Sequence, residues 1–580
     1  MLTMFDVSET KPRTLPEDEE EAERSFNNLP VQQQLEFILR HHGNERLRHL
    51  FLSHQPKELV QRLPEIELFL MVKRSGERDA LELVSLTTPE QFQFLLDLDF
   101  WDKDQLDLGK ATQWMGVLLE CGEEKVQEFI HNTDPEFIAL LLKKFLHVIK
   151  LEGEPAEVSA LALLFTLDRQ YYVAFKKPEA RPIFQRFLEY LRYVDEELYA
   201  RLMEAVIVEL ESELEELNYG HRNGRLSDHG FPGFEEALDL YRFVHPESLR
   251  SEKISARAEQ TKATEKANPI FYLTLREEGP FFSHILSQIT DSLELDRLQS
   301  EMAALCNRAM VAEPLEAFSP NEIERVTKKV FHYLNLGLEF VSRRDEAKAI
   351  DFLRSTPLAK IFQGGLGTTL LLRQKAEAIL RGPWFGGERE NLVFLDPLHL
   401  ERFEGILRKR PVHFRSGVPD DFKNLLEVEE TERFLRMVET VSNTLVDKVD
   451  LSPRHIKELN LTDCHPGDWH EIPFSTLFLT ALANLILRGS FHVEPIARDN
   501  LKQLFTRVFE KNDQGQEVIR MQIRNDLPHW LKTNETDETR SQDLLAFWDF
   551  CFDLLGGEYG RIPQKEGIDP RFVKGLIIRK

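Results

Sequence analysis

A short proline-led pattern recurs between residues 56 and 149 and restricts what this part of the chain can fold into. Pro64, Pro89 and Pro135 are each followed by a glutamate and then by adjacent apolar residues. Proline is tolerated in the first turn of a helix because its missing N–H would have no partner there. Each proline therefore predicts the start of a short helix, and the recurrence predicts similar helical units in series.

Polar residues in front of two of these prolines also indicate helix starts. Thr88 and Gln91 have the spacing of a capping box, in which each side chain bonds to the backbone N–H of the other residue. Asp134 is predicted to cap the helix that begins at Pro135. Because a unit of two short helices cannot bury its apolar face alone, neighbouring units must stack.

The fold class predicted for the whole chain is all-α, with an N-terminal α-solenoid of short two-helix repeats followed by larger helical domains. Helical periodicity continues to the C-terminus, whereas the alternating pattern of strands is scarce. At 580 residues the chain is longer than one hydrophobic core usually serves. The predicted parts are a disordered acidic tail (1–28), a helical-repeat domain (29–150), a helical domain with a glutamate-rich helix and a His/Arg/Gly loop (151–246), a charged linker (247–268) and a C-terminal helical domain (269–580).

Composition excludes several classes of function. The formal net charge of −26 repels phosphate backbones and anionic lipids, so nucleic-acid binding is not expected. No apolar stretch reaches the ~20 residues of a membrane helix, and the N-terminus has no signal-peptide pattern. The four cysteines are isolated, which is typical of a reducing compartment. We therefore expect a cytoplasmic protein that is not inserted in a membrane and whose partners are other proteins.

A glutamate-rich segment and the stretch after it hold the densest group of ionisable residues. Glu209, Glu213 and Glu216 share one face of a predicted helix, beside a stripe that is made by Leu210, Leu214 and Leu217 and is expected to be buried. Like charges at this spacing cost a few tenths of a kcal/mol per pair, so cationic partners are expected. Arg222 and Arg225 follow in a predicted loop and suit carboxylates, which predicts a structural Arg–Glu latch.

The same stretch permits a divalent-metal site. Glu216, His221, Asp228 and His229 are side-chain types that bind metals, and a carboxylate–histidine set can also act as acid and base. The residues lack the spacing of a known metal motif, so the latch is the preferred interpretation.

Other stretches carry weaker signals. His465, His470 and Glu471 lie close together, but a surface turn explains them equally well. The acidic segment from Asp97 to Asp107 lacks the glycine and closing glutamate of an EF-hand loop and is expected to be a solvated loop. Gly364–Gly367 has no following Gly-Lys-Ser/Thr, so it predicts a close-packed helix start and not a phosphate loop.

Two stretches of the chain resemble known families. The recurrence of Pro64-Glu-Ile, Pro89-Glu-Gln and Pro135-Glu-Phe resembles the N-terminal cytosolic domain of MgtE-type magnesium transporters and the middle domain of the flagellar motor switch protein. This resemblance implies stacked helices for residues 56–149. The stretch from Glu209 through Gly230-Phe-Pro-Gly-Phe-Glu-Glu-Ala-Leu resembles an uncharacterised bacterial family of long helical proteins, which has no assigned activity.

The sequence predicts a cytosolic, non-catalytic interaction or scaffold protein. No catalytic motif occurs, so no catalytic residue and no cofactor is predicted. The alternative is a metal-dependent enzyme or metal sensor that binds a divalent metal through Glu213, Glu216, His221 and His229.

Overall fold

The structure is a computed structural model and is dominated by helices, which confirms the all-α class. The chain forms two compact units: the first comprises residues 1–242 and 248–363, and the second comprises 243–247 and 364–580. The described residues are 18–41, 44–77, 79–102, 104–151, 164–251, 280–313, 319–415, 417–512, 517–523, 537–560, 569 and 574–580. Most of the predicted linker at 247–268 therefore lies outside the described residues.

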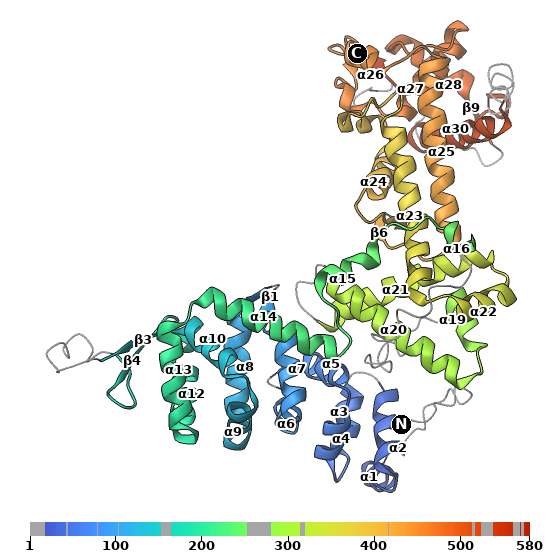
Figure 1. Cartoon of the computed structure of the whole chain (residues 1–580). Helices are drawn as coiled ribbons and strands as arrows, with labels where there is room; N and C mark the ends of the chain where they lie inside the picture. The colour runs from blue at the N-terminus through green and yellow to red at the C-terminus, as the bar shows by residue number, and fades with distance from the viewer. Residues whose placement is uncertain are drawn as a thin grey trace. The chain divides into compact units, whose positions relative to one another are not determined.

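The first unit begins with a row of short helices, coloured blue to cyan in Figure 1. Helices two apart in this row contact each other, as α3 contacts α5, α5 contacts α7 and α7 contacts α9. Their bounds are α1 (Glu19–Asn27), α2 (Val31–Arg40), α3 (Asn44–Phe51), α4 (Pro56–Arg62), α5 (Glu65–Ser75), α6 (Leu81–Ser85), α7 (Pro89–Asp99), α8 (Leu108–Glu120), α9 (Glu123–Asn132) and α10 (Pro135–Phe145). A two-residue hairpin, β1 (Trp101–Asp102) with β2 (Gln105–Leu106), joins α7 to α8.

The helix starts predicted at the three prolines are confirmed, with α5 beginning one residue after Pro64. The capping box is present: Gln91 N–H donates to Thr88 Oγ1 at 3.2 Å, and Thr88 N–H donates to Gln91 Oε1 at 3.1 Å. The prediction for Asp134 is wrong, because its side chain makes no cap and accepts a hydrogen bond from Arg225 instead.

The predicted disordered tail extends too far along the chain. Helix α1 begins at Glu19, and Ala22 and Phe26 on this helix are buried. The ring of Phe26 packs edge-on against Phe37 of α2, and the Asn27 side chain donates to the Leu52 carbonyl and accepts from His54 N–H, so contacts with later helices hold this acidic segment. Residues 1–17 lie outside the described part of the chain.

In the rest of the first unit, the described residues form mainly helices and also a β-hairpin. Strand β3 (Leu146–Lys150) pairs antiparallel with β4 (Tyr171–Phe175), with Leu146 opposite Phe175. The side chains of Asp195 and Ser319 cap α13 and α21 by accepting hydrogen bonds from Leu198 N–H and Glu322 N–H. The helices are α12 (Arg181–Val194), α13 (Glu196–Val208), α14 (Glu211–Asp228), α15 (Phe234–Leu238), α16 (Ser248–Ser251), α19 (Phe281–Ser287), α20 (Ser292–Ala312), α21 (Pro320–Ser342), α22 (Glu346–Ser355) and the start of α23 (Leu358–Leu380).

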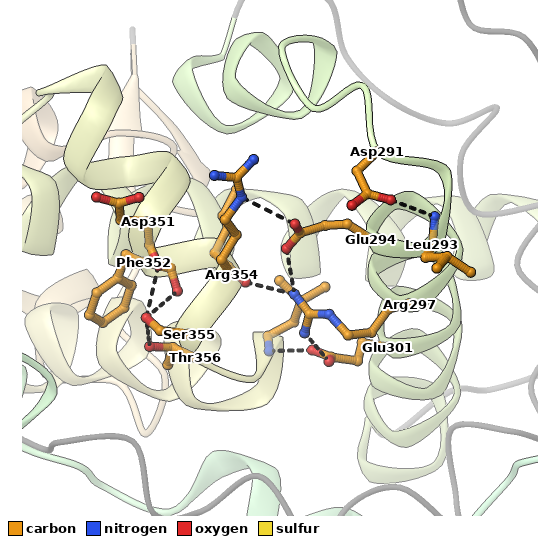
Figure 2. A network of polar contacts seen from close by, with 12 residues as sticks. Asp291, Leu293, Glu294, Arg297, Glu301, Asp351, Phe352, Arg354, Ser355 and Thr356 are labelled. Carbon is orange, nitrogen blue, oxygen red and sulfur yellow. Dashed lines mark hydrogen bonds and ion pairs between the residues drawn. The ribbon is translucent and has the colours of Figure 1, made fainter.

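A polar network on α20 fastens the ends of two other helices (Figure 2). Arg297 donates to the Leu353 carbonyl near the C-terminus of α22 at 2.8 Å, and Glu301 accepts from Leu358 N–H at the start of α23 at 2.8 Å. A cation at a helix C-terminus and an anion at an N-terminus both satisfy unpaired backbone groups and complement the helix dipole. Glu294 completes the network by binding Arg297 and Arg354.

The second unit packs long helices around aromatic side chains. Helix α25 contacts α30, which also contacts α27, and Phe478 of α27 lies against Trp548 of α30. The terminal strand β11 (Ile578–Arg579) pairs antiparallel with β7 (Cys464–His465) and parallel with β8 (Ile496–Ala497). The helices are the rest of α23, α24 (Pro397–Ile406), α25 (Leu425–Asp447), α26 (Pro453–Lys457), α27 (Phe474–Arg488), α28 (Leu501–Val508) and α30 (Glu538–Tyr559).

The glycines at 364–367 lie inside α23 and do not start it, which corrects the prediction of a helix start. A Cβ on Gly367 would lie 2.2 Å from the carbonyl oxygen of Val244. The glycine therefore allows the segment 243–247 to cross this helix at close range. Across the described residues, no helix is long and apolar enough to span a membrane.

We expect Phe94→Ala to lower the free energy of unfolding by about 3–5 kcal/mol, because Phe94 is a buried aromatic residue of α7. Its ring lies 4.7 Å from the ring of His229 and 6.1 Å from that of Phe231. Chemical denaturation of the full chain measures the change. Phe234→Ala is the matched control, since half of Phe234 is exposed and its loss leaves a smaller defect. Equal effects of the two substitutions would contradict the prediction.

Candidate functional site

Helix α14 carries most of the residues that the sequence singles out, and it extends further than predicted. It runs to Asp228, so the predicted His/Arg/Gly loop is the second half of the helix. Leu214, Asn218, Arg222 and Leu226 are buried at intervals of four residues, which places them on one face. Contacts along this face favour the helix despite the two glycines in it.

The buried face of α14 is fixed to two helices of the row by polar contacts. The Asn218 amide donates to the Glu136 carbonyl of α10 at 3.1 Å. The Arg222 guanidinium donates to the Asp97 carbonyl of α7 at 2.6 Å and lies 5.7 Å from the centre of the Trp101 ring. Figure 1 shows α14 running along the row, past α10 and α7.

Arg225 joins the same two helices through their carboxylates. Its Nε and Nη2 donate to the two oxygens of Asp97 at 2.7 and 2.9 Å, and its Nη1 donates to Asp134 at 2.9 Å. The Asp97 side chain is only 2% exposed, so it depends on this cation for its charge. An arginine latch exists, but its acceptors are on α7 and α10 and are not the predicted glutamates.

The predicted glutamates lie on the opposite, outer side of α14. Glu209, Glu213 and Glu216 are exposed, and Glu209 follows the end of α13 and precedes α14. Leu210 and Leu217 were predicted to be buried, yet they are 59% and 44% exposed. The buried line starts at Leu214 and continues through Arg222, which turns these two leucines towards solvent.

The metal-binding candidates on α14 are not brought together. His221 Nδ1 lies 3.9 Å from Asp134 Oδ2 of α10's N-cap, whereas His229 Nδ1 lies 3.7 Å from Glu65 Oε2 of α5. Glu216 and Asp228 are both exposed. Within the described ranges, no three His, Cys, Asp or Glu side chains form a group that could hold a metal ion.

The weaker candidates at 465–471 are also separated. His465 lies in strand β7 opposite Ile578, while His470 and Glu471 belong to the short helix η5 (Trp469–Glu471). The His470 ring stacks on Trp469 at 3.7 Å, and its Nδ1 lies 2.7 Å from Asp468 Oδ1. These contacts are local, which supports a surface turn and not a metal site.

The acidic segment from Asp97 to Asp107 was expected to be a solvated loop, but it begins inside α7 and its Asp99 is buried. Asp99 accepts from Trp114 Nε1 at 2.8 Å and pairs with Lys73 at 2.9 Å and Lys110 at 3.0 Å. Burial raises the pKa of the Asp99 carboxyl, but Lys73 and the other partners outweigh burial, so the net pKa is lowered. Asp107 caps α8 through Gly109 and Lys110 N–H.

Asp396 is a buried carboxyl group in the second unit that the sequence analysis did not identify. Asp396 precedes α24, yet its carboxyl accepts hydrogen bonds from the hydroxyl and N–H of Ser475 in the first turn of α27. Burial raises the pKa of Asp396 to about 6, and burial lowers the pKa of the neighbouring His399 to about 4. Ser475 is 79 residues away in sequence, so no local signal could identify this group.

The group can exchange a proton near neutral pH but is not arranged for nucleophilic catalysis. Ser475 is buried and donates its hydroxyl to Asp396. His399 Nδ1 lies 4.0 Å from Asp396 Oδ2, and the imidazole packs on Phe550. A serine nucleophile needs an imidazole base at its own hydroxyl. The arrangement is that of a buried helix cap supplied by another segment.

We expect Arg225→Ala to destabilise the protein by about 2–4 kcal/mol, because it leaves the buried Asp97 carboxylate without its cation. The matched control is Arg192→Ala, which removes a pair with the exposed Glu196 and should cost about 0–1 kcal/mol. Thermal and chemical unfolding measure both. If Arg225→Ala and Arg192→Ala unfold alike, Arg225 is not the latch.

We expect Asp396→Asn to raise the free energy of unfolding, relative to that of the unaltered chain, more at neutral pH than at low pH. The folded pKa of about 6 exceeds the ordinary value of 3.8, so the folded state favours the protonated acid. The stabilisation that Asp396 gives the folded state of the unaltered chain is fully present below pH 3.8 and is lost as the pH rises through 6. A difference of roughly 2 pKa units at about 1.4 kcal/mol each gives about 3 kcal/mol between the two limits. Denaturation of both proteins from pH 4 to 7.5 measures this, and a pH-independent difference would contradict it.

Comparison with known proteins identifies a family but no activity. A family model described as a family of unknown function (DUF6178) matches residues 23–579, and the chain therefore belongs to that family. No curated protein and no solved structure matches the chain.

Proposed function

We propose that this member of a family of unknown function is a non-catalytic cytoplasmic protein that binds other proteins. The observation that carries the proposal is the outer side of α13 and α14, where Val208, Leu210 and Leu217 are exposed within a short segment of the chain. Single exposed apolar residues are normal on a protein surface, whereas several close together in the chain favour an interaction site. The ionisable residues on the inner side of α14 hold helices together, as Arg225 does, and are not arranged for chemistry.

We also propose that the helices of residues 29–150 form an α-solenoid. The contacts between helices two apart in the row support this arrangement, and so do the recurring helix starts at Pro89 and Pro135. The resemblance of residues 56–149 to the MgtE-type N-terminal domain and the motor switch protein is consistent with it. Stacked helical repeats present extended surfaces that commonly bind proteins.

The alternative of a metal-dependent enzyme or sensor has less support. Its proposed ligands need Glu213, Glu216, His221 and His229 to converge on one ion. His221 and His229 instead lie near carboxylates of two different segments, Asp134 and Glu65. The exposed apolar residues Val208, Leu210 and Leu217 favour an interaction protein directly, and the metal alternative does not require them.

The test uses the full chain, tagged and expressed at its natural level. It is cross-linked in living cells and then analysed by size-exclusion chromatography. We expect it to elute in a larger assembly than the purified chain, with the same protein recovered in constant ratio. Elemental analysis of the purified chain should give well under one metal ion per chain. Elution as the isolated chain would contradict the proposal. A stoichiometric metal whose effect on the melting temperature is lost in His221→Ala would favour the alternative.

A further inference from the structure

The exposed residues at the junction of α13 and α14 and along the outer side of α14 are called here the outer α14 surface. Its members are outward-facing residues of three kinds, and all belong to the first unit. They are the apolar residues Ile207, Val208, Leu210 and Leu217, the acidic residues Glu209, Glu213 and Glu216, and the glycines Gly220 and Gly224.

The apolar residues of this surface keep a large part of their side chains in contact with water. Val208 is 71% exposed, and Leu210 and Leu217 are exposed by about half. Leu217 lies two turns beyond Leu210, so the two side chains follow one line on the helix. The exposed part of each apolar side chain would gain stability if a partner removed it from water.

The two glycines extend the same line. Gly220 and Gly224 are spaced by four residues on the outer side of α14, and a Cβ at either position would meet no atom within 4 Å. A glycine inside an exposed helix costs about 1 kcal/mol relative to alanine. Nothing within the described chain uses the space that they leave. A second helix that packs on this line would use it, because absent side chains let two helix backbones approach closely.

The acidic residues show which charge the occupant carries. Glu211 and Glu215, on the side of α14 that faces the row, pair with Lys144 at 2.7 and 2.6 Å. For Glu209, Glu213 and Glu216 on the outer side, no ion pair is formed with any residue that the structure describes. Glu213 and Glu216 are three residues apart, where like charges repel each other. Cations from another molecule would relieve this repulsion.

We propose that the outer α14 surface docks an amphipathic helix of another protein that carries lysine or arginine beside its apolar side. This rests on the proposed interaction function and adds the place and the chemistry of the partner. The partner's apolar residues cover Val208, Leu210 and Leu217, its backbone approaches at Gly220 and Gly224, and its cations pair with the outer glutamates. This is the mode in which an amphipathic helix lies along an apolar surface. A nucleic acid offers only anions to these carboxylates and is repelled.

The test is a display library of 20-residue segments tiled across the proteins of the source organism, selected for binding to the full chain. We expect the enriched segments to carry net positive charge and to place apolar residues at helical spacing. Leu217→Asp should weaken their binding by about tenfold or more, since a few central apolar residues dominate such interfaces. Glu213→Lys with Glu216→Lys should also weaken it, and added salt should reduce binding to the unaltered chain.

Leu293→Asp is the matched control, because Leu293 is a 79% exposed leucine on α20 and away from this surface. Its substitution should leave binding unchanged, and melting temperatures of all variants establish that they fold. Enriched segments that are neutral or acidic, or that bind Leu217→Asp as well as the unaltered chain, would overturn the inference and leave the interaction function standing. No enriched segment at all would overturn both.

Discussion

The contact between Arg225 and the Asp97 carboxylate, together with the buried contacts of Asn218 and Arg222, fixes how α14 lies on the row of helices. Asp97 is almost fully buried, and a buried carboxylate is stable only with a well-placed cation. The two parallel hydrogen bonds to Asp97 and the third to Asp134 fix the rotation of α14 about its axis. With that rotation set, Leu214 and Leu226 face the row of helices, and Leu210 and Leu217 must face outward. The exposed surface is thus a consequence of the latch.

Features that depend on neighbours in sequence could be predicted, and those that depend on distant partners could not. The helix starts at Pro89 and Pro135 and the capping box of Thr88 need only residues within one turn. Asp134 has the same local pattern as a cap, but Arg225, which is 91 residues away, takes its carboxylate. The glycines of α14 indicate a loop locally, whereas contacts with Asp97 and Glu136 stabilise a helix.

The residue types of the candidate site could be predicted, but their pairing could not. Arg225 was expected to bind a carboxylate, and it does, but Asp97 is 128 residues distant and Glu213 is only twelve positions away. Proximity in sequence was a poor guide because Glu213 and Arg225 both lie on α14, where twelve residues separate them by about 18 Å along the helix axis. The Asp396–Ser475 contact, between the starts of two helices, could be seen only once the fold was known.

Two kinds of glutamate on α14 differ in what they offer a partner. Glu211 and Glu215 already pair with Lys144, whereas Glu213 and Glu216 form no ion pair with any described residue. The chain has 99 acidic and 73 basic residues, and cations such as Lys144 and Arg225 are occupied on the inner side. The excess negative charge attracts any cationic molecule, but at physiological salt this attraction is screened beyond about 8 Å. Charge alone therefore speeds encounter and does not select a site. Selection of one partner needs exposed apolar area that only a matching surface can cover. Leu210 and Leu217, which the latch turns outward, supply that area beside Glu213 and Glu216, which form no ion pair with the residues that the structure describes.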